Sequence, residues 1–108
     1  HLEGDKALCI VADALSDLCR GVGGICCRYG GDEFAALIRL HGEASAENFI
    51  YTLQQAVRDA ATAAELPYNV EISVGWTTYN SRSEPLSQAV ERADIEMYER
   101  KRSKGIHR

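Results

Sequence analysis

Residues 25–38 read Ile25-Cys26-Cys27-Arg28-Tyr29-Gly30-Gly31-Asp32-Glu33-Phe34-Ala35-Ala36-Leu37-Ile38, and this stretch decides the fold. Both of its ends are apolar and strand-like, and a Gly-Gly connection between two such runs is typical of a tight β-hairpin. Glycine tolerates positive φ and, having no side chain, allows another molecule to approach the backbone closely. We expect Asp32 and Glu33 to open the returning strand with their side chains on opposite faces. The stretch therefore predicts a hairpin that presents two adjacent acids.

The length and composition indicate one domain with a modest core. The chain has 108 residues, of which 45% are hydrophobic, and a formal net charge of −4. This size supports a single domain, and the negative charge argues against general attraction to nucleic acid. No apolar run approaches the length needed to span a bilayer, and no leader-like segment opens the chain. We expect no nucleic acid partner and no membrane contact from this segment.

Four cysteines stand at positions 9, 19, 26 and 27, without a Cys-x-x-Cys pair of metal-binding spacing. Cys26 and Cys27 are neighbours in a predicted strand, so they point to opposite faces. We interpret all four as small buried hydrophobes in a reducing cytosol.

The remaining elements follow from apolar periodicity. The spacing predicts an amphipathic helix over 5–19, and a second helix that Ser45 caps and Pro67 ends. Residues 68–79 alternate as a strand, and residues 86–101 form a last helix. The order helix, strand, strand, helix, strand, helix predicts an α+β fold with an antiparallel sheet packed by helices.

Four segments resemble one known family, the GGDEF domain of diguanylate cyclases. Gly30 to Phe34 carry its five-letter signature unaltered, and Arg28 is the customary arginine two residues earlier. The other matching segments come in family order: residues 1–5, residues 71–75, and residues 93–101 of the last helix.

The resemblance implies a ferredoxin-like or nucleotidyl-cyclase palm with a βαββαβ core that here lacks its first strand and helix. Residues 1–108 would then be a partial GGDEF domain, the C-terminal two-thirds. The sequence leaves three explanations open: a fragment, upstream residues that are not counted, or a strand supplied by another copy. A missing first strand would leave open edges on the hairpin and on the strand at 68–79.

The resemblance also implies an activity, the condensation of two GTP molecules into cyclic di-GMP with release of pyrophosphate. It gives Asp32 and Glu33 catalytic and metal-binding roles, with two Mg²⁺ or Mn²⁺ ions per active site. Each subunit would hold one GTP, so catalysis would require a homodimer. The bland alternative is that both acids only solubilise a hairpin.

Substrate-binding roles are implied for His1, Asp5, Gly30, Gly31 and Lys101. Asp5 has two compatible interpretations, because an acid at a helix start complements the helix dipole and a carboxylate can also accept two hydrogen bonds from guanine. Lys101 matches a phosphate-binding lysine, although a lysine at a helix end is usually only solvated. Gly21 and Gly24 replace the residues of the family's inhibitory product site, so we expect no feedback inhibition by that route.

We expect a cytoplasmic signalling enzyme with an upstream sensory domain. Regions upstream of this segment could anchor the parent protein to a membrane. The first metal-binding aspartate of the family is absent from this chain, so we expect the 108 residues alone to be inactive. The alternative function is a non-catalytic, GGDEF-like regulatory module that binds GTP or a protein partner.

Overall fold

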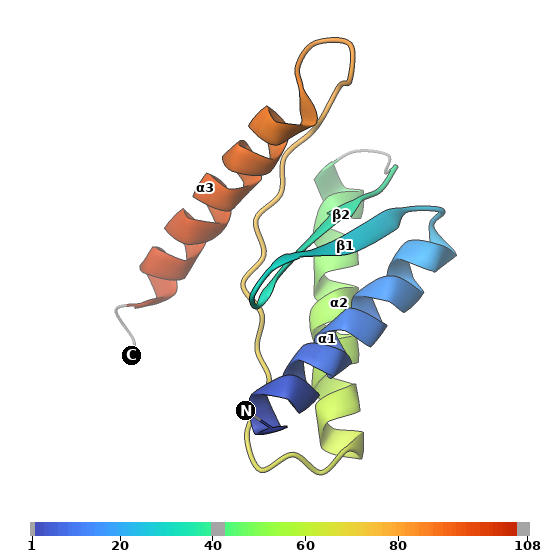
Figure 1. Cartoon of the computed structure of the whole chain (residues 1–108), viewed down its shortest axis with the longest axis vertical. Coiled ribbons are helices and arrows are strands. Elements are labelled where there is room, and N and C mark those ends of the chain that lie inside the picture. The colour runs from blue at the N-terminus through green and yellow to red at the C-terminus, as the bar shows by residue number, and fades with distance from the viewer. Residues whose placement is uncertain (1, 40–42, 106–108) are drawn as a thin grey trace. The chain divides into compact units, whose positions relative to one another are not determined.

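The computed structural model describes residues 2–39 and 43–105, and it shows an α+β fold (Figure 1). The elements in chain order are α1 (Leu2–Gly21), β1 (Ile25–Gly30), β2 (Glu33–Leu37), α2 (Glu43–Ala63) and α3 (Leu86–Gly105). The chain divides into two compact units, His1–Glu71 and Ile72–Arg108. The expected class and the order of the first four elements are confirmed, and this order is compatible with the palm fold. None of the described helices is both long and apolar enough to cross a membrane.

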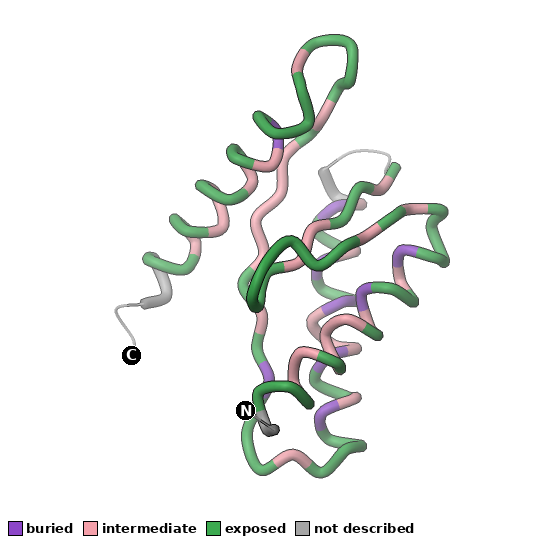
Figure 2. The backbone as a smooth tube through the Cα atoms, viewed as in Figure 1, coloured by how far each residue is buried: buried purple, intermediate pink, exposed green. Residues whose placement is uncertain are grey.

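The first unit packs α1 against α2 and against both strands of the hairpin. Its buried side chains recur at helical spacing along the facing sides of the two helices, which is why both sequences form amphipathic helices. The buried residues are Leu15, Cys19, Ala46, Ile50, Leu53, Val57 and Ala61, with Val70 after α2. Figure 2 shows buried segments along both helices. Val57 is fully buried, so truncating it to Ala would cost about 2 kcal/mol.

β1 and β2 form a two-stranded antiparallel ladder in which Cys27 pairs with Ala35 and Arg28 pairs with Phe34. The register then shifts, so that Tyr29 is bulged out and Gly30 pairs with Glu33. The turn is therefore formed by Gly31 and Asp32, one residue later than expected. Only Glu33 opens the returning strand, whereas Asp32 lies in the turn itself.

A Schellman motif joins α1 to β1. The amide of Gly24 donates to the carbonyl of Cys19 at 2.7 Å, and the amide of Gly23 donates to that of Arg20 at 3.4 Å. Gly23 has φ +72°, a left-handed conformation that glycine adopts without steric cost. This motif turns the chain back at once, so β1 runs along α1.

The boundaries of α2 differ from those expected. The helix begins at Glu43, so Ser45 lies inside it and is not the cap. At its end the amide of Leu66 donates to the carbonyl of Ala61 at 3.1 Å, and Glu65 takes φ 56°. This second Schellman motif ends the helix before Pro67, because its left-handed residue already turns the chain.

The strand expected at 68–79 is not formed. Among the described residues the sheet has two strands, and residues 69–80 have no regular secondary structure. A strand exists only through ladder hydrogen bonds to a neighbour, and no described strand pairs with this segment. The alternating pattern predicted a strand at 68–79, and that prediction was wrong.

The second unit is held together by close packing of this segment on α3. A Cβ atom at Gly75 would lie 2.7 Å from Cα of Met97, so only glycine permits the approach. The amide of Trp76 donates to Oε1 of Glu96 at 2.5 Å. On α3, Ala89 is buried and Ala93 and Met97 are half-buried, whereas Leu86 at the start of the helix is exposed.

The cysteines are all free thiols, but they do not share one environment. Cys19 is buried and Cys26 is half-buried, whereas Cys9 and Cys27 are exposed. The prediction that all four are buried was wrong for three of them. Burial, with a further contribution from the neighbouring Cys26 thiol, raises the pKa of Cys19 from 9.0 to about 11.

Candidate functional site

The hairpin tip gathers four of the residues expected in the site. Gly30, Gly31, Asp32 and Glu33 are consecutive and all exposed, as Figure 2 shows along the end of the hairpin. A Cβ atom at either glycine would meet nothing within 4 Å. The tip therefore offers two adjacent carboxylates beside backbone that a ligand can approach closely.

Arg28 holds the turn from the strand that precedes it. Its Nε donates a hydrogen bond to the carbonyl oxygen of Gly31 at 2.7 Å, and its side chain is otherwise exposed. Sequence reasoning noted Arg28 only as part of a signature and missed this contact. The available signal was its spacing, three residues before a turn whose central carbonyl has no ladder partner.

Asp5 lies near the start of α1 and is exposed. Because β1 packs on α1 and runs back along it, the turn at 31–32 lies toward the end of α1 that carries Asp5 (Figure 1). The fold thus brings Asp5 and the hairpin tip to the same end of the first unit. Leu8, on the next turn of α1, is half-buried. His1 lies outside the described residues.

Lys101 belongs to the second unit. It is exposed near the end of α3, where a cation also complements the helix dipole. Its expected role in binding phosphate stays a prediction.

Asp32 and Glu33 at the tip could supply part of the ligand set of a hard divalent cation. Across residues 2–39 and 43–105, no three His, Cys, Asp or Glu side chains gather where they could hold a metal ion. Mg²⁺, however, is usually bound by only one or two protein carboxylates together with water and substrate phosphates. Asp32 and Glu33 suit that pattern, because both are exposed beside an unobstructed backbone.

Arg92 organises the second unit, and sequence reasoning missed it. It forms a two-point salt bridge with Glu84, with Nη2 to Oε2 at 2.7 Å, and Nη2 also donates to the carbonyl of Thr78 at 2.9 Å. The hydrogen bond and charge of Arg92 lower the pKa of Glu84, and those of Glu84 raise the pKa of Arg92. The pair ties the loop after Thr78 to α3.

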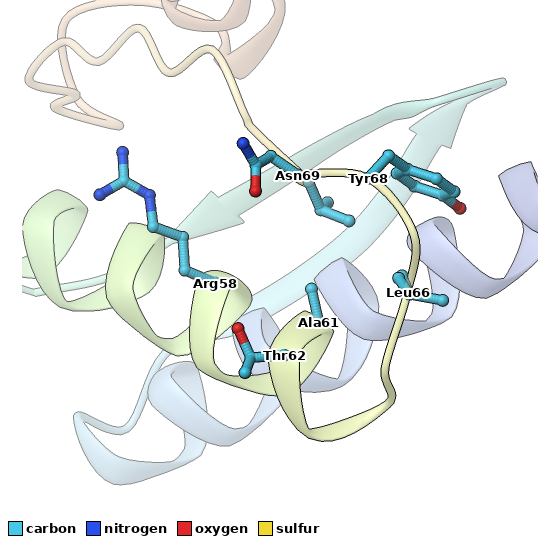
Figure 3. Close-up of a pocket in the computed structure, with 7 residues that line it drawn as sticks. Arg58, Ala61, Thr62, Leu66, Tyr68 and Asn69 are labelled. Carbon is cyan, nitrogen blue, oxygen red and sulfur yellow. The ribbon is translucent and has the colours of Figure 1, made fainter.

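A shallow pocket opens beside the end of α2, between this helix and the segment that follows it (Figure 3). Arg58, Tyr68 and Asn69 contribute polar groups, and Ala61 and Leu66 contribute apolar surface. None of the residues expected in the active site lines this pocket. The hairpin tip, rather than the pocket, is therefore the candidate site.

The comparisons with known proteins identify the family. Residues 1–106 match the family described as "Diguanylate cyclase, GGDEF domain", so the chain belongs to the GGDEF-domain family. The chain is similar to a protein of Treponema denticola named "Diguanylate cyclase A", with 30% identity over 104 residues. The match covers 95% of this chain and 28% of that relative's length. No solved structure matches the chain.

Proposed function

We propose that this chain forms the GTP-binding and catalytic part of a diguanylate cyclase, which condenses two GTP molecules into cyclic di-GMP and releases pyrophosphate. The observation that carries the proposal is the hairpin tip, where two exposed acids stand beside two unobstructed glycines. Membership of the family supports it. The chain spans 28% of the relative that it matches, and the residues 1–108 are proposed to be a partial GGDEF domain.

In the proposed reaction the 3′-hydroxyl of each GTP attacks the α-phosphate of the other, so that two phosphodiester bonds form and two pyrophosphates leave. Asp32 accepts the hydroxyl proton, and Asp32 and Glu33 would hold Mg²⁺ or Mn²⁺, two ions per site. The bound ions would offset the phosphate charge and activate the attacking oxygen. Glu33 lies next to the attacking hydroxyl or the second ion. Because no third metal-binding side chain joins Asp32 and Glu33 among the residues that the structure describes, we expect the 108-residue chain alone to be inactive.

The other site residues bind substrate in this proposal. The carboxylate of Asp5 accepts hydrogen bonds from N1–H and the exocyclic amine of guanine, a two-point contact that adenine lacks. Gly30 and Gly31 allow the nucleotide to approach the backbone, His1 lies near it, and Lys101 contacts its phosphates. One GTP per subunit makes the active form a homodimer. We also propose an upstream sensory domain that controls the enzyme and a cytoplasmic location for the reaction.

The test compares Asp32→Asn and Glu33→Gln in the whole protein that contains this segment, with Asp13→Asn as a matched exposed acid on α1. We expect each tip variant to lower cyclic di-GMP synthesis by at least about 100-fold and Asp13→Asn to leave it unchanged. GTP binding by equilibrium titration is measured in parallel. A wild-type protein that binds GTP or a partner protein but forms no cyclic di-GMP would instead be a regulatory module.

A further inference from the structure

At the hairpin tip the carbonyl of Gly31 accepts a hydrogen bond from a side chain of the preceding strand. It belongs to the central peptide of the turn, beyond the last ladder pair, Gly30 with Glu33. Such a carbonyl cannot join the ladder, so it is left to water or to a side chain. Here Nε of Arg28 donates to it at 2.7 Å.

The orientation of this peptide group determines the backbone angle φ of Asp32. Gly31 has φ +41°, whereas Asp32 has no positive φ, which is the sign pattern of a type II′ turn. Flipping the peptide between the two residues would produce a type I′ turn, which requires positive φ at Asp32 as well. A donor fixed on the Gly31 carbonyl opposes that flip.

The bulge at Tyr29 accompanies this arrangement. The ladder shifts by one residue between Arg28 and Gly30, so strand and turn are joined without a regular pair at Tyr29. Bulges of this kind redirect neighbouring side chains and occur next to active sites. Arg28 keeps its pairing with Phe34 and reaches the turn through its own side chain.

We propose that Arg28 is a positioning residue for the acids at the hairpin tip: its hydrogen bond to Gly31 holds the central peptide in one orientation and thereby fixes the direction in which Asp32 projects. The role in catalysis rests on the proposed function. The effect on the turn does not, because it concerns the hairpin alone.

The test uses three variants of the whole protein. Arg28→Met removes the donor at similar length, Arg28→Lys keeps a donor, and Arg39→Met removes an exposed arginine beyond β2. We expect Arg28→Met to lower kcat about tenfold with KM for GTP changed less than about twofold, because the reacting groups are misplaced rather than the substrate lost. Arg28→Lys should recover most of kcat, and Arg39→Met should match the wild type.

Hydrogen exchange of the peptide spanning residues 28–34 is measured on the same proteins. Faster exchange in Arg28→Met than in Arg28→Lys is expected, and equal exchange in all variants would overturn the proposal. A rise in KM with unchanged kcat would place the guanidinium on the substrate and would also overturn it. If the wild type forms no cyclic di-GMP, the proposed function fails, whereas hydrogen exchange still decides whether Arg28 holds the turn.

Discussion

A Cβ atom at Gly75 would stand 2.7 Å from Cα of Met97, a separation that real side chains essentially never show. The irregular segment at 69–80 and α3 are thus in direct backbone contact at Gly75. We expect Gly75→Ala to force them apart and to destabilise the second unit by about 1–3 kcal/mol. Urea unfolding measures the change. Gly21→Ala is the control, because a Cβ atom there meets nothing within 4 Å. An equal loss of stability in both variants would contradict the close contact of Gly75 with α3.

The salt bridge between Arg92 and Glu84 predicts a dependence of stability on acid. Arg92 lowers the pKa of Glu84 below its ordinary 4.5, so the folded state binds this proton less readily than the unfolded state. The stabilisation of the folded state by this salt bridge is complete above pH 4.5. It is lost as pH falls through the lower pKa that Glu84 has in the folded state. Glu84→Gln should remove this part of the acid sensitivity in unfolding curves, and Glu99→Gln should not. An unaltered acid profile in Glu84→Gln would refute the prediction.

From the raised pKa of Cys19 we predict that the stability of the protein falls at high pH. The pKa of Cys19 is raised from 9.0 to about 11 in the folded state. The stabilisation that its protonated thiol contributes to the folded state is therefore complete below pH 9 and is lost as pH rises toward 11. We also expect iodoacetamide at pH 8 to modify the exposed Cys9 and Cys27 before Cys19, as mass spectrometry of each thiol would show. Cys19→Ala should remove part of the alkaline sensitivity, with Cys27→Ser as the control. Labelling of Cys19 as fast as Cys27 would contradict its burial.

The two glycines of the turn should respond differently to alanine. Gly31 has φ +41°, where a Cβ atom costs about 1–2 kcal/mol, whereas Gly30 has no positive φ. Gly31→Ala should therefore lower the free energy of unfolding by about that amount and Gly30→Ala by less. Both should lower cyclic di-GMP synthesis by the whole protein if substrate approaches the backbone. Equal losses of stability would show that the turn is not as described.

We predict that replacing Glu65 with glycine stabilises the protein. Glu65 is the left-handed residue of the Schellman motif that ends α2, with φ 56°. Glu65→Gly should relieve a strain of about 1 kcal/mol and raise the midpoint of thermal unfolding. Ala63→Gly, two residues earlier in the helix, should instead lower it, because glycine weakens a helix. A lower midpoint for Glu65→Gly would exclude the motif as the helix end.

The helices could be predicted because their signal is local. Leu15 and Cys19 on α1, and Leu53 and Val57 on α2, recur at helical spacing, and all four are buried. Ser45 misled the prediction of a helix start, because a capping residue type is also tolerated inside a helix when packing favours it. The strand at 68–79 could not be predicted reliably, since alternation describes extended chain but pairing requires a neighbour elsewhere in the fold.

The sequence by itself determined the hairpin, the three helices and the adjacent acids at 32 and 33, because periodicity and turn chemistry act over a few residues. It also carried the family signature. Only the tertiary structure decided which residues form the turn, that Arg28 holds the Gly31 carbonyl, and which of the cysteines is buried. Those features depend on strand register and on packing between segments, which couple distant residues and leave no local periodicity to read.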